Sequence, residues 1–400
     1  MRVLIVGQLP KEAGGTYTTG IARVIENLYQ KNFGGPEIYW YFTNVIDKVA
    51  QEKCKYKDQY HGYRIIPFCM LWGCIRHPIN TFKEWNHYKR IDNVNPIRYD
   101  FYKHNFLKVI ENVQPDLIHL HGAGMSPLYY ATKGKGKKVV LTYHGVMYNE
   151  NDKSSWHFKP LYQSCMQMAD YFTVLNQETK RKALGLGMPS DRYAIIPNGV
   201  DTSHYYFSLD QRDILRKQFQ VNPDCRVFLT TGLVINRKGQ YDFIKELESL
   251  NIDYQYWIVG KGPDEQKINK YIAENGLEKK VKLLGYVVGT ELYKYLSAAD
   301  VYAHVSTTEG QALSEIEAYA TGLKILVRKE IAGTVIGDSH NDRRYFVLDM
   351  SSQNLSDKTE LEKWIDIDLK RTAITGRIDW RDVALLYGNY YSNILNSIIK

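Results

Sequence analysis

The chain has 400 residues, of which 44% are hydrophobic and 24% charged, a composition typical of a globular protein long enough for two domains. Its net charge of +8 at pH 7 is uneven, because residues 1–200 carry 26 basic and 16 acidic side chains and the remainder carries 26 and 28. No apolar run approaches the roughly 18 residues that a membrane-spanning helix needs, and no nucleic-acid recognition module is visible, so we expect neither a transmembrane helix nor a nucleic-acid partner.

The first half alternates short β-branched runs with longer helical patterns. A buried strand is predicted at residues 2–7, followed by a glycine-rich loop and by a helix at about 19–30 with Ile21, Val24, Ile25 and Leu28 on one face. Further strands are predicted at residues 117–120, 139–143 and 171–175. This alternation favours a parallel sheet with helices on both faces.

The alternation restarts after Pro197–Asp201, where Pro and Asn-Gly interrupt the pattern, and we expect an irregular stretch from there to about Pro223. Strands are then predicted at residues 227–231, 256–259, 281–284, 301–305, 325–327 and 345–348. The fold class predicted is α/β, with two doubly wound Rossmann-like domains at residues 1–200 and 201–378. Two such sheets facing each other create a cleft at the carboxyl ends of their strands, where ligands bind.

The strongest local signal is the acidic segment 308–318, which follows the predicted strand 301–305 and opens a helix. Glu309 lies in the strand-to-helix loop, and Glu317 lies eight residues further on, so both can face the same side. The start of a helix favours a diphosphate, and carboxylates suit sugar hydroxyls. The alternative is a solvent-facing acidic helix.

Other candidates also lie where a predicted strand ends. Lys238 would neutralise charge on a departing diphosphate, or is an exposed lysine at the start of a helix. His144 could bind a sugar hydroxyl, or be an ordinary core histidine. Gly14 and Gly15 would let the backbone approach a ligand, or form a plain turn.

Two further histidines, His119 and His121, alternate along one predicted strand and share a face. No third ligand has a spacing suited to a metal, so we interpret both as structural or as lining the cleft. Asp366-Ile367-Asp368 superficially matches a metal-binding DxD motif, but it lacks a strand-end context and is interpreted as chance. We therefore expect no required metal.

The frame Glu-Gly-x-x-Leu-Ser-x-x-Glu from Glu309 to Glu317 resembles the donor-site motif of family 4 glycosyltransferases (GT4), which are retaining enzymes of the GT-B fold. Trp380 resembles the start of the family's terminal helix, which would place a helix at residues 379–400 that crosses back to the N-terminal domain. Further stretches resemble family motifs in the family's order: Ala13–Gly15, Pro115–His121, Val140–His144, Ile196–Asp201, Val259–Pro263 and Leu283–Val287.

The resemblance implies an acceptor-binding first domain, a second domain that binds a nucleotide sugar, and transfer with retention of configuration. One departure stands out, because Gly232-Leu233-Val234 replaces the family's Gly-Arg-Leu and leaves the role of Arg237 open. The residues implied are, for catalysis, His144, Lys238 and Glu309; for the donor, Gly15, Arg237, Gly285, Tyr286, Val287, Gly310, Ala312, Leu313 and Glu317; and for the acceptor, Gly14, Gly15 and Thr16.

The predicted function is therefore metal-independent transfer of a hexose from a nucleotide-diphosphate sugar, UDP slightly favoured over GDP, without a cofactor. The acceptor would be a glycan, a lipid-linked sugar or a small molecule, in surface polysaccharide or glycoconjugate synthesis. The alternative is a non-catalytic GT-B partner subunit or sugar-nucleotide-binding protein, which only the missing arginine supports.

The expected location is the cytoplasm, because no signal-peptide pattern precedes the apolar run at residues 3–6 and the five cysteines show no disulfide or zinc spacing. The aromatic and basic segment from Trp72 to Lys108, with Lys133, Lys135, Lys137 and Lys138, suits an anionic membrane surface. A solvated basic face is the alternative to this peripheral association.

Overall fold

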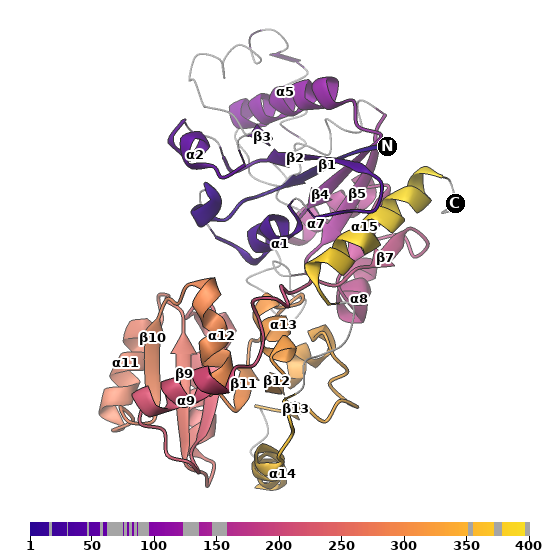
Figure 1. Ribbon diagram of the computed structural model, residues 1–400. Coiled ribbons are helices and arrows are strands. Elements are labelled where there is room, and N and C mark those ends of the chain that lie inside the picture. Colours follow the sequence, from indigo (N-terminus) through magenta and orange to yellow (C-terminus); the bar gives the residue numbers. More distant parts are fainter. Residues whose placement is uncertain are drawn as a thin grey trace. The chain divides into compact units, whose positions relative to one another are not determined.

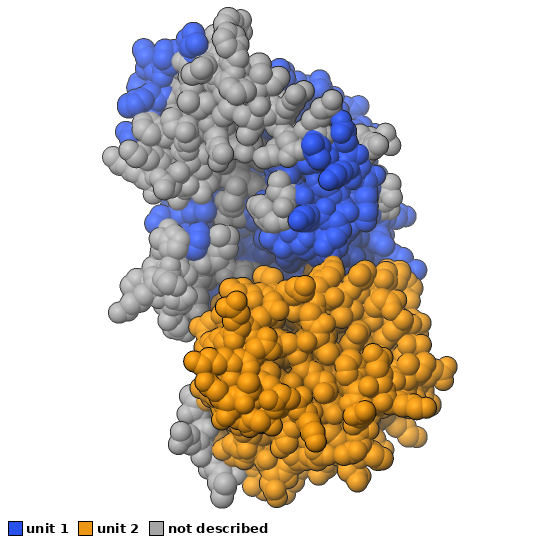
Figure 2. All heavy atoms as spheres, turned by 90° about the vertical axis from the view of Figure 1, so that its left-hand side faces the viewer, with its two compact units in different colours: residues 1–198, 380–400 blue, residues 199–379 orange. Residues whose placement is uncertain are grey.

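The structure is a computed structural model that describes residues 1–15, 18–29, 31–45, 48–56, 59–61, 75, 78–79, 82–83, 86, 96–122, 136–145, 158–350, 355–371 and 378–396. The chain forms two compact units, which Figure 2 shows in different colours. The first unit contains residues 1–198 and 380–400, and the second contains residues 199–379.

The first unit is built on a seven-stranded parallel sheet with the order β3-β2-β1-β4-β5-β6-β7 (Figure 1). Because the order runs outward from β1 in one direction and from β4 in the other, the connections leave these two strands toward opposite faces. The strands are β1 (Arg2–Gly7), β2 (Glu37–Phe42), β3 (Tyr60–His61), β4 (Leu117–His121), β5 (Lys138–Tyr143), β6 (Tyr171–Val174) and β7 (Tyr193–Ile195).

Helices cover both faces of this sheet. Ile118 and Leu120 of β4 pack into the core on the face of α5 (Pro96–Val113), α7 (Lys159–Met168) and α8 (Gln177–Gly185). The intervening His119 points to the other face, where it contacts Tyr391 of α15 (Trp380–Leu395), the yellow helix that lies against the first unit in Figure 1. Other helices with described bounds are η1 (Lys11–Ala13), α1 (Gly20–Leu28), which packs beside α15, and α2 (Lys48–Lys53).

The second unit repeats the plan with a six-stranded parallel sheet of order β10-β9-β8-β11-β12-β13. One face is covered by α10 (Gln240–Glu248), α11 (Glu265–Glu274) and α14 (Leu355–Asp366). The other is covered by α9 (Leu209–Gln218), α12 (Gly289–Ala298), α13 (Leu313–Ala320) and η5 (Lys329–Thr334). The strands are β8 (Arg226–Thr231), β9 (Tyr254–Val259), β10 (Val281–Gly285), β11 (Val301–His304), β12 (Lys324–Arg328) and β13 (Tyr345–Leu348).

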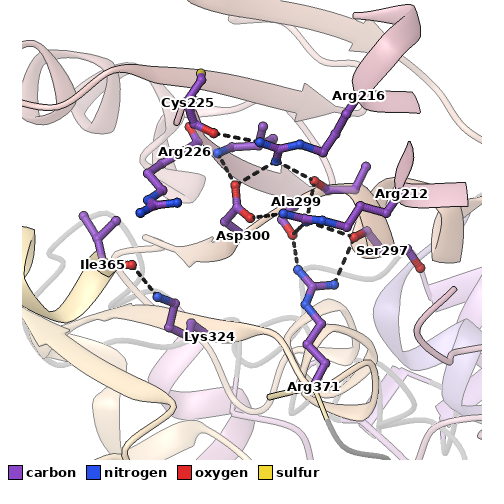
Figure 3. Close-up of polar contacts among 12 residues, drawn as sticks. Arg212, Arg216, Cys225, Arg226, Ser297, Ala299, Asp300, Lys324, Ile365 and Arg371 are labelled. Carbon is purple, nitrogen blue, oxygen red and sulfur yellow. Dashed lines mark hydrogen bonds and ion pairs between the residues drawn. The ribbon is translucent and has the colours of Figure 1, made fainter. Parts of the chain in front are cut away.

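The predicted irregular stretch up to Pro223 is wrong, because α9 occupies its second half. The side chain of Ser208 caps this helix, but only Leu215 within it is buried, so the helix has almost no apolar periodicity to detect. Its anchor is ionic: Arg212 and Arg216 lie 2.6 and 2.9 Å from the Asp300 carboxylate (Figure 3).

Around Asp300 the N–H groups of the arginine side chains donate hydrogen bonds to backbone carbonyls of the protein. Arg212 donates to the carbonyls of Ser297, Ala298 and Ala299 at the end of α12, and Arg371 donates to carbonyls of the same turn (Figure 3). These guanidinium groups satisfy carbonyls that a helix end leaves without partners and complement its negative dipole. The cluster lies beside the amino end of β11. There it links both α9 and the segment that ends at Arg371 to the carboxyl end of α12.

The predicted strands are confirmed to within two residues at each end, and the first helix begins one residue later, with Thr19 as its cap. Within the described ranges, three strands were missed: β2, β3 and β7. A signal for β2 was present, since Gly34-Gly35-Pro36 precedes an aromatic and β-branched run. β3 and β7 are only two and three residues long and carry too little pattern to recognise.

Candidate active site

The second sheet reverses its order between β8 and β11, and the segments that follow these two strands meet at their carboxyl ends. The chain after β8 forms η4 (Asn236–Lys238), and the chain after β11 runs through Glu309 to α13. The two segments are joined by a hydrogen bond of 2.8 Å from the Thr307 N–H to the Arg237 carbonyl. Ligands of open α/β sheets bind at such a point of reversal.

Glu309 is the centre of an ion cluster at this point. Its Oε1 accepts hydrogen bonds from Nζ of Lys238 at 2.6 Å and from Nη1 of Arg237 at 3.2 Å. Arg237 also donates to the Thr308 carbonyl at 2.8 Å. The structure therefore brings together three residues that the sequence analysis selected separately, and it directs Arg237 into the site.

Burial and the neighbouring positive charges act in opposite directions on the pKa of Glu309. Burial of the side chain, which is 6% exposed, raises the pKa, but Lys238 and Arg237 outweigh it and lower the pKa to about 2. Glu309 is thus ionised at neutral pH, and the three side chains together carry one positive charge. Among the described residues, Nη2 and Nε of Arg237 have no hydrogen-bond partner, so the cluster can still donate to an anion.

Close backbone packing shapes the loops at this end of the sheet. A Cβ on Gly260 would meet the Gly232 carbonyl oxygen at 1.7 Å, and one on Gly239 would meet the Val305 carbonyl oxygen at 2.2 Å. Both glycines also have positive φ, at 145° and 71°, which other residues rarely adopt. Gly239 in particular allows Lys238 and the start of α10 to lie against the loop after β11.

Three buried polar atoms beside the cluster lack a hydrogen-bond partner within the part of the chain that the structure describes. They are Nε2 of His304, Oγ1 of Thr308 and Oε1 of Gln240. Burial, opposed by Glu309, lowers the pKa of His304 to about 4, so this ring is neutral at pH 7. Unsatisfied buried polar atoms are uncommon in proteins, and these three lie on the segments that follow β8 and β11 or at the end of β11. Sequence reasoning did not select Gln240 or His304, although His304 ends a strand that had been predicted, and it assigned no role to Thr308, the first residue of the acidic segment.

Four of the other predicted donor residues follow β11, whereas Gly15 lies in the first unit. Gly310 and Ala312 are buried in the loop before α13, Leu313 begins that helix, and Glu317 lies one turn along it, half-buried. We expected Glu309 and Glu317 to face the same side because they would lie about two turns apart on one helix. That reason is wrong, because Glu309 lies four residues before the helix begins.

The predicted donor residues Gly285, Tyr286 and Val287 lie at the end of β10 and in the loop that follows it. Gly285 has a φ of 70°, and its carbonyl accepts a hydrogen bond of 2.7 Å from the Gly260 N–H. Tyr286 is 57% exposed, and Val287 is half-buried. The loop is thus tied to the segment after β9 and presents an aromatic ring at its surface.

In the first unit, His144 follows β5 and is 6% exposed. Its Nε2 lies 3.3 Å from Nδ1 of His121, which ends β4. His119, two residues earlier, contacts Tyr391 and Thr142 instead. The described residues contain no group of three or more His, Cys, Asp or Glu side chains arranged to hold a metal ion.

The glycine loop after β1 differs from the expectation. The N–H groups of Gly14 and Gly15, expected to face a ligand, donate instead to the carbonyls of Lys11 and Pro10. Gly15 is required for packing, because a Cβ there would meet the Leu9 carbonyl oxygen at 1.8 Å. Thr16 lies outside the described residues.

Two observations on the described residues bear on the predicted membrane association. No helix in the described part of the chain combines the length and the hydropathy needed to cross a bilayer. Ile75, Ile79 and Phe82 are 66%, 70% and 62% exposed, whereas about half of the aromatic and basic segment, together with Lys133 and Lys135, lies outside the described residues.

Comparison with known proteins gives two family matches. The family described as "Glycosyltransferase Family 4" matches residues 61–204, and the family described as "Glycosyl transferases group 1" matches residues 211–374. The first match lies within the first unit except for its last residues, and the second lies within the second unit.

Individual relatives have low sequence identity to this chain. The chain is 29% identical over 142 residues to alpha-monoglucosyldiacylglycerol synthase of Acholeplasma laidlawii, covering 34% of this chain and 36% of that protein. It is 26% identical over 222 residues to the putative teichuronic acid biosynthesis glycosyltransferase TuaC of Bacillus subtilis, covering 54% and 53%. The matches thus span about a third to a half of the length of these relatives.

A solved structure matches the whole chain. HepE of Anabaena in complex with UDP aligns with a TM-score of 0.68 and 16% identity, covering 100% of this chain and 99% of that one. At this identity the likeness concerns the fold, and it extends over both units.

Proposed function

Since this chain belongs to the family 4 glycosyltransferases and has their GT-B fold, we propose that it transfers a sugar from a nucleotide-diphosphate donor to an acceptor, with retention of anomeric configuration. The observation that carries the proposal is the Lys238–Glu309 pair at the reversal point of the second sheet. The donor would bind in the second unit, and the acceptor in the first.

The cluster suits the leaving nucleotide diphosphate. Lys238 and Arg237 supply two positive charges against one on Glu309, and α10 and α13 both begin beside them. Cationic side chains and helix N-termini stabilise negative charge that develops on a departing phosphate. Arg237 would replace the arginine absent from Gly232-Leu233-Val234, using the nitrogens that Glu309 and Thr308 leave unused.

Retention needs either a carboxylate nucleophile or attack from the face that the diphosphate leaves. Glu309 already accepts hydrogen bonds from two cations, which lowers its nucleophilicity. We therefore assign it to the sugar hydroxyls and to the orientation of Lys238. In this mechanism the leaving phosphate oxygen takes the proton of the acceptor hydroxyl as that hydroxyl attacks the same face, and catalysis rests on positioning and charge stabilisation.

UDP-sugars are the donors we propose first, ahead of GDP-sugars. The Anabaena protein of the same fold was solved with UDP and with UDP-glucose. The names of the two relatives given above describe glycolipid and polysaccharide synthesis. We therefore propose a lipid-linked or polysaccharide acceptor. The +10 charge of residues 1–200 would attract an anionic acceptor or membrane surface.

The test is release of nucleotide from a panel of UDP-, GDP- and ADP-sugars, each with and without a lipid-linked acceptor. A bound donor should also raise the unfolding temperature by mass action, which identifies the nucleobase even before an acceptor is known. Binding without release under every acceptor condition would favour the sugar-nucleotide-binding alternative.

A further inference from the structure

The first unit contains a buried polar network in which two neighbouring histidines have different roles. His119 is fully buried, and both its ring nitrogens are bonded: Nδ1 to the Tyr391 hydroxyl at 2.6 Å and Nε2 to Oγ1 of Thr142 at 2.7 Å. Thr142 in turn contacts Oγ1 of Thr173 at 2.6 Å. His119 thus ties β4, β5, β6 and α15 together, and it has no nitrogen left for a ligand.

His121 is also buried, but it has one bonded nitrogen instead of two. Its Nδ1 lies 3.3 Å from Nε2 of His144, whereas its Nε2 has no hydrogen-bond partner within the described part of the chain. The other aromatic rings beside it in the described part of the chain are those of His119 and Tyr387, and neither carries a charge. Among the described residues, His121 therefore bonds only the imidazole of His144.

Both rings of the pair are neutral at pH 7. Burial lowers the pKa of His144 to about 4, and burial together with the neighbouring imidazoles lowers the pKa of His121 well below its ordinary value. A hydrogen bond between two neutral imidazoles needs one nitrogen that carries a proton and one that does not.

The unbonded Nε2 of His121 decides which ring donates. If His144 donated from Nε2, the proton of His121 would have to lie on Nε2, as a buried N–H group without an acceptor. Buried N–H groups without partners are rarer than buried acceptors without partners. The favoured arrangement therefore has the proton of His121 on Nδ1, donating to Nε2 of His144.

We propose that His121 is a positioning residue that holds His144 in the tautomer with its proton on Nδ1. His144 then presents an N–H donor to a hydroxyl oxygen of the bound sugar or acceptor, and it does not act as a base. Among the described residues, Nδ1 of His144 has no partner that would compete for this role. The kinetic part of this inference rests on the proposed function, but the tautomer does not.

Two variants separate positioning from packing. Asn in H121N places an amide donor close to the position of Nδ1, whereas Leu in H121L fills similar space without a donor. A third variant, Y391F, removes a hydroxyl from the same buried network by breaking its bond to His119, without touching His121 or His144.

The experiment is ¹⁵N NMR of histidine-labelled protein, which reports which ring nitrogen of His144 carries the proton; H144Q assigns the signal. We expect Nδ1–H in the wild type, H121N and Y391F, and a mixture of tautomers in H121L. In nucleotide release, H121L should lower kcat about 10-fold with little change in the donor KM. H121N should keep most of the wild-type kcat. Y391F should lower the unfolding temperature without changing the tautomer.

An Nε2–H tautomer of His144 in the wild type would overturn the proposal without any variant having to fold. An unchanged tautomer in H121L would overturn it as well. If the wild type releases no nucleotide from any sugar donor, the proposed function fails, while the NMR result still decides the role of His121.

Discussion

Nζ of Lys238 lies 2.6 Å from Oε1 of Glu309, although the two residues are 71 positions apart in the sequence. The contact exists because Lys238 follows β8, Glu309 follows β11, and these strands are neighbours in a parallel sheet. Residues from distant segments thus converge at one edge, which is the property that makes such folds suited to binding nucleotides.

We expect transfer to continue in excess EDTA. In the proposed mechanism, Lys238 and Arg237 would provide at the diphosphate the positive charge that a divalent ion provides in other phosphate sites, so the leaving group would be stabilised without one. Nucleotide release should be measured before and after chelation. Complete loss that Mg²⁺ or Mn²⁺ restores would contradict this expectation.

Replacing Asp300 should destabilise the second unit. Its carboxylate, with a side chain 15% exposed, pairs with Arg212 and Arg216 and accepts the Val227 N–H at 2.8 Å. D300A leaves two partly buried guanidinium groups without their counter-ion, and we expect a loss of about 3–5 kcal/mol in the free energy of unfolding. Urea unfolding measures this loss. The control is E274A, which removes the partner of Lys270 in an exposed pair and should cost less than about 1 kcal/mol.

Glu315 should make the protein less stable as the pH rises. This carboxyl is fully buried, and burial, opposed by hydrogen bonds from Tyr345 and the Ile336 N–H, raises its pKa from 4.5 to about 7. The folded state therefore binds its proton more tightly than the unfolded state. The stabilisation is complete below about pH 4.5 and is lost as the pH rises through 7, by up to about 3 kcal/mol.

The measurement is the free energy of unfolding between pH 5 and pH 8 for the wild type and E315Q. The amide does not titrate, so the difference between the two proteins should change across this range in the variant's favour. A difference that stays constant with pH would show that Glu315 is ionised throughout.

The first unit should bind anionic vesicles at low salt. Ile75, Ile79 and Phe82 are exposed apolar side chains in a basic segment, a combination that suits the interface of an anionic bilayer. Sedimentation with vesicles containing phosphatidylglycerol should retain the protein and release it at high salt. I79S/F82S should weaken retention; a wild type that stays in the supernatant at low salt would favour a soluble acceptor.

The sequence predicted where the strands end, and these ends carry the residues that we propose for the donor site. Lys238 and Glu309 each follow a β-branched run, and parallel strands bring such ends together whatever their separation in the chain. Arg237 could not be assigned in this way, because the direction of a side chain in a loop depends on tertiary contacts with Thr308 and Glu309.

Other features depend on partners that no local pattern reveals. His119 and His121 share a face and look equivalent in the sequence, yet Tyr391, 272 positions away, bonds only one of them. The reason for a glycine at position 15 is also a tertiary contact, since a Cβ there would meet the Leu9 carbonyl oxygen. α9 escaped prediction because its contacts are ionic and its apolar face is reduced to Leu215.

The most direct test compares nucleotide release by the wild type, K238M and E309Q, with K329A as a control in an exposed ion pair of the same unit. With the best donor and acceptor pair, we expect K238M and E309Q to lower kcat/KM by about 100-fold or more and K329A to match the wild type. Circular dichroism and unfolding temperature must show that the variants fold. Folded K238M and E309Q proteins with wild-type rates would contradict the assignment of this cluster as the donor site.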